Sequence, residues 1–410
     1  MKAEIITIGD ELLIGQVIDT NSAWMAEQLN QIGINVHQIT SISDQSQHIL
    51  KTLKEAGNRA RIVLITGGLG PTRDDITKDA LCQYFATRLV LNQEALADVM
   101  RFFEKRNIAI TELNRKQAEL PEDCKSIPNP IGTARGMWFE KDNTVYISMP
   151  GVPFEMKQMM LTSILPLLKE KFSLATVIHK TILTTGLGES FLAARIEDWE
   201  DNLPAGVKLA YLPQPGIVRL RLTGKSCHAD KLKNDITDHT NKLKALIPDL
   251  IFGEDQDTME KVVGEKLKDK GESLSTAESC TGGYIAHLIT SLPGSSTWYN
   301  GSIVSYSNNA KSTLLDVPHE LLEKHGAVSK EVVEVMAKNV REKLKTTWSI
   351  AVSGIAGPDG GTIEKPVGTV WIAIAGPNLV YSEQFLFGDN RERNIRRSAI
   401  AALNLLRIRL

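Results

Sequence analysis

The stretch Ile62-Val63-Leu64-Ile65-Thr66 runs directly into Gly67-Gly68. Five consecutive apolar or β-branched residues that end at glycine are typical of a strand buried on both faces. Similar β-branched or apolar runs occur at residues 3–9 and 144–149. Helical patterns separate these runs, so residues 1–170 are predicted to form a mostly parallel sheet covered by helices on both faces.

The rest of the chain divides into two further parts. Alternating apolar and basic residues at 216–222 predict a half-solvated strand, and the polar segment 229–246 predicts a surface helix. These elements place a small α+β module at residues 171–253. It lacks the G-x-x-G loop with which KH-type RNA binders clamp a nucleic-acid backbone. Strands and helices then alternate again through residues 254–410, which predicts a third, α/β domain.

Composition excludes several classes of protein. The 410 residues include 47 Lys and Arg against 49 Asp and Glu, a formal net charge of -2, which gives no overall attraction for nucleic acid or an anionic membrane. The longest uncharged stretch, residues 279–310, is rich in small polar residues and is broken by Pro293-Gly294, so we expect no membrane helix. The first residues do not resemble a signal peptide. The cysteines, which show no disulfide-framework or metal-binding spacing, are Cys82, Cys124, Cys227 and Cys280. We therefore expect a cytoplasmic protein with reduced thiols.

A candidate catalytic turn lies at residues 276–283, T-A-E-S-C-T-G-G. It places Ser279 and Cys280 where a strand ends and a helix begins. A hydroxyl or thiol at such a turn can act as a nucleophile, and free N–H groups of the first helical turn can hold an oxyanion. The alternative is that Ser279 or Thr281 only caps the helix.

Two more polar loops follow strand ends in the same domain. The loop at residues 305–311, S-Y-S-N-N-A-K, ends with Lys311, which can act as a base only if burial or a nearby cation lowers its pKa. An exposed surface lysine is the alternative. The loop at residues 353–361, S-G-I-A-G-P-D-G-G, is suited to phosphate or to close approach of a planar ring, or is simply a long turn. Ligands of α/β folds bind at the carboxyl ends of strands, so the loops predict one shared site.

These three loops, followed by K-P-V-G-T-V-W at residues 365–371 and F-x-F-G-D-x-R at residues 385–391, resemble the C-terminal domain of the CinA family. That domain is a nicotinamide mononucleotide deamidase. The resemblance implies that Ser279 attacks the carboxamide, that Lys311 is its base, that Tyr306 supports the lysine, and that no metal or other cofactor takes part. Cys280 remains a rival nucleophile, because sulfur is intrinsically more nucleophilic than oxygen.

The resemblance also implies a set of substrate-binding residues. Backbone amides near Thr281 and Gly282 would hold the oxyanion, and an arginine at the start of the last helix would reach the 5′-phosphate. The alternative for these arginines is a solvated helix face with an ion pair between Glu392 and Arg396. The expected substrate-binding residues of this domain are Thr281, Gly282, Gly283, Ser305, Ser353, Gly354, Gly357, Arg391 and Arg396.

The N-terminal domain has its own candidate site after the strand at residues 62–66. The stretch I-T-G-G-L-G-P-T-R-D-D, residues 65–75, is neither a Walker A loop nor a dinucleotide fingerprint, but it offers a phosphate-sized nest of backbone N–H groups. Asp74 and Asp75 are suited to a divalent cation, or they only charge a helix N-terminus. Asp10 and Glu11 add carboxylates at another strand end of the same sheet.

Together with N-P-I-G-T-A-x-G (residues 129–136) and M-P-G-V-P-x-E-M (residues 149–156), this stretch resembles the molybdopterin-binding fold in the variant that opens CinA proteins. The resemblance implies ADP-ribose pyrophosphatase activity that depends on a divalent Mg, Mn or Co ion. The candidates for metal binding and water activation are Asp10, Glu11, Asp44, Asp74 and Asp75, and those for phosphate binding are Gly67, Gly68 and Gly70. Binding of a pterin or molybdopterin is the alternative.

Over the full chain, the resemblance implies an α/β protein with a molybdopterin-binding-like three-layer domain at residues 1–170, a KH-like module at 171–253 and a CinA deamidase domain at 254–410. Nicotinamide mononucleotide and ADP-ribose, the expected substrates, are both breakdown products of NAD. We expect a homodimer without nucleic-acid or membrane partners. The rival hypothesis is a non-catalytic nucleotide- or pterin-binding protein linked to competence, as the family's name suggests.

Overall fold

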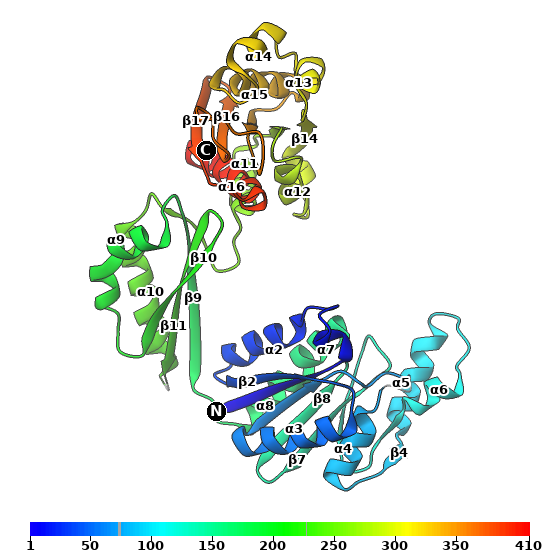
Figure 1. The fold of residues 1–410 in the computed structure, drawn as a ribbon. Coiled ribbons are helices and arrows are strands. Elements are labelled where there is room, and N and C mark those ends of the chain that lie inside the picture. The colour runs from blue at the N-terminus through cyan, green and yellow to red at the C-terminus, as the bar shows by residue number, and fades with distance from the viewer. Residues whose placement is uncertain (73–74, 227) are drawn as a thin grey trace. The chain divides into compact units, whose positions relative to one another are not determined.

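The computed structural model describes residues 1–72, 75–226 and 228–410, which form two compact units (Figure 1). One unit comprises Met1–Ile178 with Gly224–Leu232, and the other comprises His179–Thr223 with Lys233–Leu410. Both mix helices and strands. In the part of the chain that the structure describes, no helix combines the length and the apolar character needed to cross a membrane.

The first unit is built on a six-stranded sheet with the order β2-β1-β3-β8-β7-β6. Its first four strands are parallel, and the last two are antiparallel to their neighbours. These strands are β2 (Asn35–Ile42), β1 (Lys2–Ile8), β3 (Ile62–Thr66), β8 (Thr144–Met149), β7 (Gly136–Lys141) and β6 (Lys125–Ile127). A separate antiparallel pair consists of β4 (Leu89–Leu91) and β5 (Glu119–Pro121). The predicted buried strand at 62–66 is confirmed, because every residue of β3 is buried.

Helices cover both faces of this sheet (Figure 1). The helices of this unit are α1 (Asp10–Leu13), α2 (Thr20–Gln31), α3 (Ser46–Arg59), α4 (Thr77–Phe85), α5 (Gln93–Glu104), α6 (Glu112–Lys116), α7 (Pro153–Met159), the π-helix η1 (Met160–Ile164) and α8 (Leu165–Lys171), of which α1 and α6 bury no side chain. Successive strand residues point to opposite faces. Ile5 and Leu64 therefore pack with α2, α7 and α8, whereas Ile6 and Ile65 pack with α3 and α4. The three-layer domain predicted from the sequence is confirmed.

The second unit begins with a four-stranded sheet of order β10-β11-β9-β12. Its elements are β9 (Thr176–Thr185), α9 (Glu189–Asp201), β10 (Val207–Gln214), β11 (Ile217–Ser226), α10 (Ala229–Leu246) and β12 (Ile251–Glu254). The bounds of α10 match the helix predicted from the polar pattern. Leu183 of β9 and Phe252 of β12 belong to the hydrophobic cluster of the C-terminal part, so the core of this unit is continuous.

The C-terminal part has a five-stranded sheet of order β14-β13-β15-β16-β17. These strands are β14 (Tyr299–Val304), β13 (Leu274–Glu278), β15 (Trp348–Gly354), β16 (Thr369–Gly376) and β17 (Leu379–Leu386). The helices are α11 (Met259–Lys270), α12 (Tyr284–Thr290), the 3₁₀ turn η2 (Ser295–Thr297), α13 (Asn308–Leu315), α14 (His319–His325), α15 (Lys330–Leu344) and α16 (Arg391–Arg409). One cluster packs α11, α12 and α16 on the sheet, and another packs α14 and α15.

The register of this sheet determines where the candidate loops meet. β13 is parallel to both β14 and β15, and Glu278 at its end pairs with Val304 and with Val352. The three polar loops predicted from the sequence therefore leave neighbouring strands at the same edge, as expected for an α/β site.

The cysteines show no sign of a disulfide in the described part of the chain. Cys82, Cys124 and Cys280 are free thiols. Cys227, the fourth cysteine considered from the sequence, lies outside the described residues.

Candidate active site

The turn after β13 holds Ser279 in a fixed position at the carboxyl edge of the sheet. The Ser279 N–H donates to the carbonyl of Val352 at 3.0 Å, and the Ser279 carbonyl accepts from the N–H of Gly282 at 3.1 Å. Gly282 and Gly283 have φ values of 59° and 96°, in the left-handed region that favours glycine. The turn is thereby tight enough to place the serine side chain just before α12.

Lys311 reaches Ser279 from the first turns of α13. Its Nζ lies 2.8 Å from the Ser279 Oγ and 2.9 Å from the carbonyl oxygen of Ser305. The lysine is buried, with 1% of its surface exposed, so the surface-lysine alternative does not describe it. Burial without a carboxylate partner disfavours the charged ammonium and lowers the pKa of Lys311 below its ordinary value. The serine and the lysine predicted from the sequence are therefore brought into direct contact.

Cys280, the rival nucleophile, carries a thiol whose pKa is raised above its ordinary value. Burial raises the pKa of its thiol to about 12, although the positive charges of Lys311 and Arg391 act in the opposite direction. The thiolate is the reactive form of cysteine, and at neutral pH this side chain is a protonated thiol. The surroundings therefore favour Ser279, whose hydroxyl already contacts a base.

Glu278 has a function in this turn that the sequence analysis did not assign. Its buried carboxylate accepts the N–H groups of Gly283, Ile285 and Ala286 at 3.0, 3.1 and 2.9 Å. The carboxylate thus occupies the positive end of α12 and satisfies its free amides. An acidic residue immediately before a glycine turn and a helix is the signal that could have identified this cap.

The amides left for an oxyanion therefore lie earlier in the turn. The N–H of Gly282 is engaged by the Ser279 carbonyl. In the described residues, no acceptor is found for the N–H of Thr281, and the N–H of Cys280 contacts only the thiol of its own residue. The hydroxyls of Thr281 and Ser305 are also buried without a hydrogen-bond partner there. A buried polar group without a partner costs free energy and is therefore rare in folded proteins. Binding of a substrate would supply the missing partners.

Tyr306 and Arg391 meet at the exposed side of this site. The backbone carbonyl of Tyr306 lies 3.5 Å from Lys311 Nζ, whereas its ring is 60% exposed and points its hydroxyl toward Arg391. Tyr306 therefore contacts the lysine through its backbone, not through its phenol. Arg391 also donates to the carbonyl of Gly357 at 2.7 Å, which joins the second and third loops.

Three other residues predicted to bind substrate, Arg396, Ser353 and Gly354, make contacts within the protein. Arg396 forms an ion pair with Glu392 at 2.9 Å on the exposed face of α16, as the alternative interpretation of these arginines describes. Ser353 donates its hydroxyl to the carbonyl of Ala327 at 2.7 Å, which anchors the end of β15. Gly354 follows at the end of that strand, where an added Cβ would lie 2.9 Å from the carbonyl of Thr369.

The N-terminal candidate site also forms at a carboxyl edge. Gly67 and Gly68 have φ values of 112° and 63°, and the loop continues to Gly70, whose N–H donates to Asp75 at 2.8 Å. Asp75 also accepts from the N–H of Thr72 at 2.9 Å and from the Thr72 hydroxyl. The amide of Gly70, predicted to bind phosphate, is thus engaged by a carboxylate of its own loop.

Carboxylates from three strand ends approach one another at this edge. The N–H of Asp10 donates to Asp44 at 3.2 Å. The pKa of Asp44 is raised, first by partial burial and then by the negative charges of Asp10, Glu11 and Asp75. Asp74 lies outside the described residues.

These oxygen donors fit a divalent cation in chemistry, because such a cation would relieve the repulsion that raises the Asp44 pKa. The residues that would hold it are Asp10, Glu11, Asp44 and Asp75. Within the described ranges, however, no three His, Cys, Asp or Glu side chains form a group ready to hold a metal ion.

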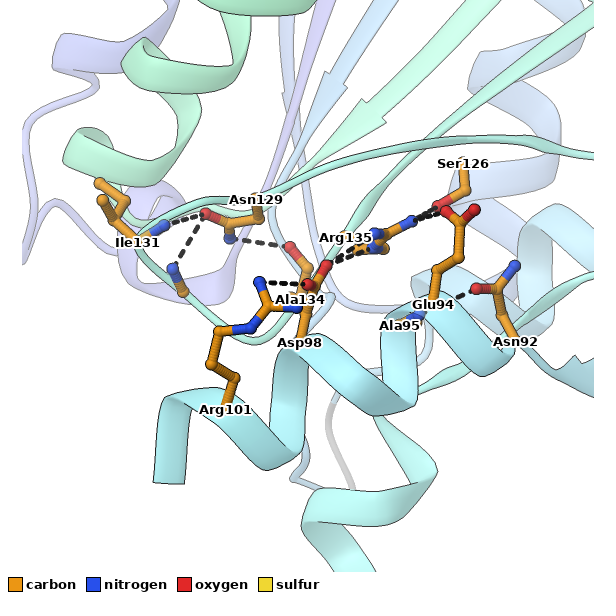
Figure 2. A network of polar contacts seen from close by, with 11 residues as sticks. Asn92, Glu94, Ala95, Asp98, Arg101, Ser126, Asn129, Ile131, Ala134 and Arg135 are labelled. Carbon is orange, nitrogen blue, oxygen red and sulfur yellow. Dashed lines mark hydrogen bonds and ion pairs between the residues drawn. The ribbon is translucent and has the colours of Figure 1, made fainter. Parts of the chain in front are cut away.

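The other two N-terminal motifs stabilise the frame of this domain, and Figure 2 shows the one around Asn129 and Arg135. Asn129 donates to the carbonyl of Ala134 at 2.9 Å and to Glu155 of α7 at 2.6 Å, which closes the loop between them. Arg135 is nearly buried and is neutralised by Asp98 at 2.6 Å and Glu94 at 3.0 Å, both on α5 (Figure 2). The two motifs thereby join β7, α5 and α7.

The fold and the two edges define a three-domain α/β protein with a buried serine–lysine pair in its last domain. Three family models match successive parts of the chain: "Probable molybdopterin binding domain" at residues 4–170, "Damage-inducible protein CinA KH domain" at 179–253 and "CinA C-terminal domain" at 256–410. The chain belongs to the CinA family. The KH-like character expected for the middle module is confirmed.

Individual relatives extend this match over the whole chain. The CinA-like protein of Flavobacterium psychrophilum is 50% identical over 410 residues, covering 99% of this chain and 98% of the relative. A putative competence-damage inducible protein of Halothermothrix orenii is 42% identical over 395 residues, covering 96% and 95%. The crystal structure of the competence/damage inducible protein CihA from Agrobacterium tumefaciens is 37% identical, covers 36% of this chain and 91% of its own, and has a TM-score of 0.36.

Proposed function

We propose that the C-terminal domain hydrolyses the carboxamide of nicotinamide mononucleotide to nicotinic acid mononucleotide and ammonia. The observation that carries this proposal is the contact of 2.8 Å between the Nζ of buried Lys311 and the Oγ of Ser279. A lysine whose pKa is lowered by burial holds a larger neutral fraction near pH 7, and only the neutral amine can accept a proton.

The first half of the reaction is acyl transfer to the serine. Neutral Lys311 takes the hydroxyl proton while the Ser279 Oγ attacks the carboxamide carbon. The oxygen of the tetrahedral intermediate then carries a negative charge, and the N–H groups of Cys280 and Thr281 are the donors best placed to hold it. Collapse of the intermediate breaks the C–N bond, and the Lys311 ammonium returns its proton to the departing nitrogen, which leaves as ammonia.

The second half uses the same groups with water as the nucleophile. Lys311 takes a proton from water, and the resulting hydroxide attacks the ester carbonyl of the acyl-enzyme. The intermediate releases nicotinic acid mononucleotide when the Ser279 oxygen leaves and recovers its proton from Lys311. Protons and electrons balance within the Ser279–Lys311 pair and the substrate, so the proposed steps include no metal.

Selectivity for a mononucleotide is assigned to Arg391. Two of its guanidinium N–H groups contact Gly357 and Tyr306, and its other donors remain for a phosphate. The hydroxyls of Thr281 and Ser305, which have no partner among the described residues, are suited to the polar atoms of the carboxamide or the attacking water.

The direct test is ammonia release from nicotinamide mononucleotide in the presence of EDTA, with wild-type protein and Ser279→Ala compared. Turnover that survives EDTA and disappears in Ser279→Ala supports the proposal. A folded wild-type protein that releases no ammonia would contradict it. The non-catalytic binding protein linked to competence would then be the better hypothesis.

For the N-terminal domain, we propose hydrolysis of ADP-ribose to AMP and ribose 5-phosphate with a divalent Mg, Mn or Co ion. The observation that favours it is the gathering of carboxylates around Asp44 at one sheet edge, where Asp44 accepts from the N–H of Asp10 at 3.2 Å and where burial and the charges of Asp10, Glu11 and Asp75 raise its pKa. A bound cation would neutralise these carboxylates and polarise a phosphoryl oxygen. ADP-ribose turnover that is indifferent to chelator would contradict the proposal, and tight pterin binding without turnover would favour the pterin alternative.

A further inference from the structure

The second compact unit contains a cleft that neither candidate active site uses. Its volume is about 740 Å³, within the range of about 300–1,000 Å³ that is usual for small-molecule sites. The β10–β11 turn and the loop before α9 line one wall, and β17 and α16 line the other. The wall on α16 is one face of the helix, because its residues recur at the spacing of successive helical turns: Arg393, Arg397, Ile400, Ala401, Asn404, Leu405 and Ile408.

One end of this helix face is cationic. Arg393 is exposed to the cleft, and none of the described residues forms a hydrogen bond or ion pair with its side chain. Arg397 donates to the carbonyl of Phe387 at 2.5 Å and lies over the ring of the same residue at 4.8 Å, so it is held in place, and its other donors have no partner among the described residues. Two guanidinium groups one turn apart, one of them without a partner, are suited to a phosphate.

The β17 side of the cleft carries two aromatic rings. The rings of Phe385 on β17 and of Phe387, just after this strand, stack on each other at 5.4 Å with an interplanar angle of 17°. Gly216 in the opposite turn has a φ of 84° and lies so close to α16 that an added Cβ would touch Ile400 at 3.4 Å. The partly buried flat rings offer a surface on which a planar group can stack.

Two carboxylates also line the cleft and restrict where an anion can bind. Glu383 accepts from the hydroxyl of Tyr381 at 2.9 Å, and Glu189 stands in the first turn of α9. Their negative charges disfavour an anion at their positions, so the phosphate is assigned to the arginine end of α16. Arg393, which has no partner among the described residues, and the aromatic pair, of which Phe387 already lies under Arg397, point to a ligand that carries both an anionic group and a flat ring.

We propose that this cleft binds a mononucleotide, with its phosphate at Arg393 and Arg397 and its base against Phe385 and Phe387. The site is separate from the serine–lysine pair, but Arg391 and Arg393 belong to the same first turn of α16. A nucleotide held by Arg393 therefore adjoins the turn from which Arg391 contacts Gly357. An effect of the bound nucleotide on ammonia release would depend on the proposed deamidase function. Binding of the nucleotide to the cleft does not depend on that function.

The test is calorimetric titration of the full-length protein with AMP, adenosine and inorganic phosphate in parallel. We expect saturable binding of AMP that is at least tenfold tighter than that of adenosine or phosphate alone. Arg393→Ala should weaken it at least tenfold, and Arg393→Glu should abolish it. Arg396→Ala is the matched control, because Arg396 is an exposed arginine of the same helix that pairs with Glu392 and does not line the cleft.

A second measurement locates the ligand without relying on mutations. Photolabelling with 8-azido-AMP should mark peptides that contain residues 213–218 or 385–405, and excess AMP should prevent the labelling. Labelling confined to the N-terminal domain or to peptides around Ser279 would overturn the proposal. AMP affinity that is equal in wild type and Arg393→Ala, or no saturable AMP binding at all, would also overturn it, whether or not the protein releases ammonia.

Discussion

The guanidinium of Arg391 donates to the hydroxyl of Tyr306 at 2.9 Å, although the two residues stand 85 positions apart in the sequence. The same arginine donates to the carbonyl of Gly357. The first residue of α16 therefore connects the loop that presents Lys311 with the glycine-rich loop after β15. This connection places a cation at the exposed side of the Ser279–Lys311 pair.

Replacement of Arg391 should separate substrate binding from chemistry. We expect Arg391→Ala to raise the KM for nicotinamide mononucleotide about tenfold or more and to change kcat much less, since a charge-assisted hydrogen bond contributes about 1.5–3 kcal/mol. Arg396→Ala, which removes an exposed arginine from the same helix, should leave both constants unchanged. A fall in kcat with constant KM would show that Arg391 acts on the reacting atoms instead.

The assignment of the nucleophile predicts opposite results at neighbouring positions. Ser279→Ala should reduce ammonia release by several orders of magnitude, because it removes the attacking oxygen. Cys280→Ala should retain most activity, because the buried thiol with its pKa of about 12 stays protonated. The check is the initial rate of ammonia release for both variants at neutral pH, and the reverse order of rates would transfer the role to Cys280.

Local patterns predicted most of the structural frame, because they depend on neighbouring residues. The run at 62–66 predicted a buried strand, and the polar periodicity at 229–246 predicted the bounds of α10. The convergence of the loops after β13, β14 and β15 was predictable for the same reason, since the carboxyl ends of parallel strands share one edge. The likeness of motifs to the CinA family added the expectation that Ser279 is the nucleophile and Lys311 its base.

The directions of side chains and the contacts between distant segments could not be predicted from the sequence. The exposed phenol of Tyr306 and its partner Arg391 depend on how two distant loops meet, which no local pattern encodes. The carboxylate cap of Glu278 depends on burial, and a glutamate at a strand end is usually solvated. The cleft beside α16 combines a hairpin turn at residues 213–218 with a helix that begins at Arg391, so only the folded chain brings its walls together.

The cap on α12 predicts that Glu278 positions the catalytic turn. Glu278→Gln keeps one acceptor oxygen but turns an NH₂ group toward amides that need an acceptor, so we expect a loss of about 1–3 kcal/mol in the free energy of unfolding. The measurement is the midpoint of urea unfolding with an unchanged m-value. Ser302→Ala is a mild control, because its hydroxyl contacts the same carboxylate at 3.5 Å. A Glu278→Gln variant as stable as wild type would contradict the structural role of the carboxylate.

The carboxylates of the N-terminal edge predict an effect of metal on stability that can be measured without turnover. Asp44 has a raised pKa, so folding favours its protonated form, and stability is lost as pH rises through that pKa. Asp44→Asn should therefore raise the Tm above that pKa. Mn²⁺ should raise the Tm of wild type clearly and that of Asp44→Asn less. Equal shifts in both proteins, or no shift in wild type, would argue against a cation at Asp44.

The lowered pKa of Lys311 predicts two linked pH effects. Neutral lysine is the active form, so kcat/KM should rise with pH through the Lys311 pKa and level off below the range of an ordinary lysine, near 10.5. Between the folded pKa and 10.5, the unfolded chain holds a proton at this residue that the folded chain has lost, so stability rises with pH across that window. The difference in Tm between wild type and Lys311→Met should therefore shift in favour of wild type as pH rises toward 10.5. Two results together would contradict this: a Tm difference between wild type and Lys311→Met that stays constant with pH, and a kcat/KM that keeps rising up to about pH 10.5. They would show that burial does not keep Lys311 neutral and that another group activates Ser279.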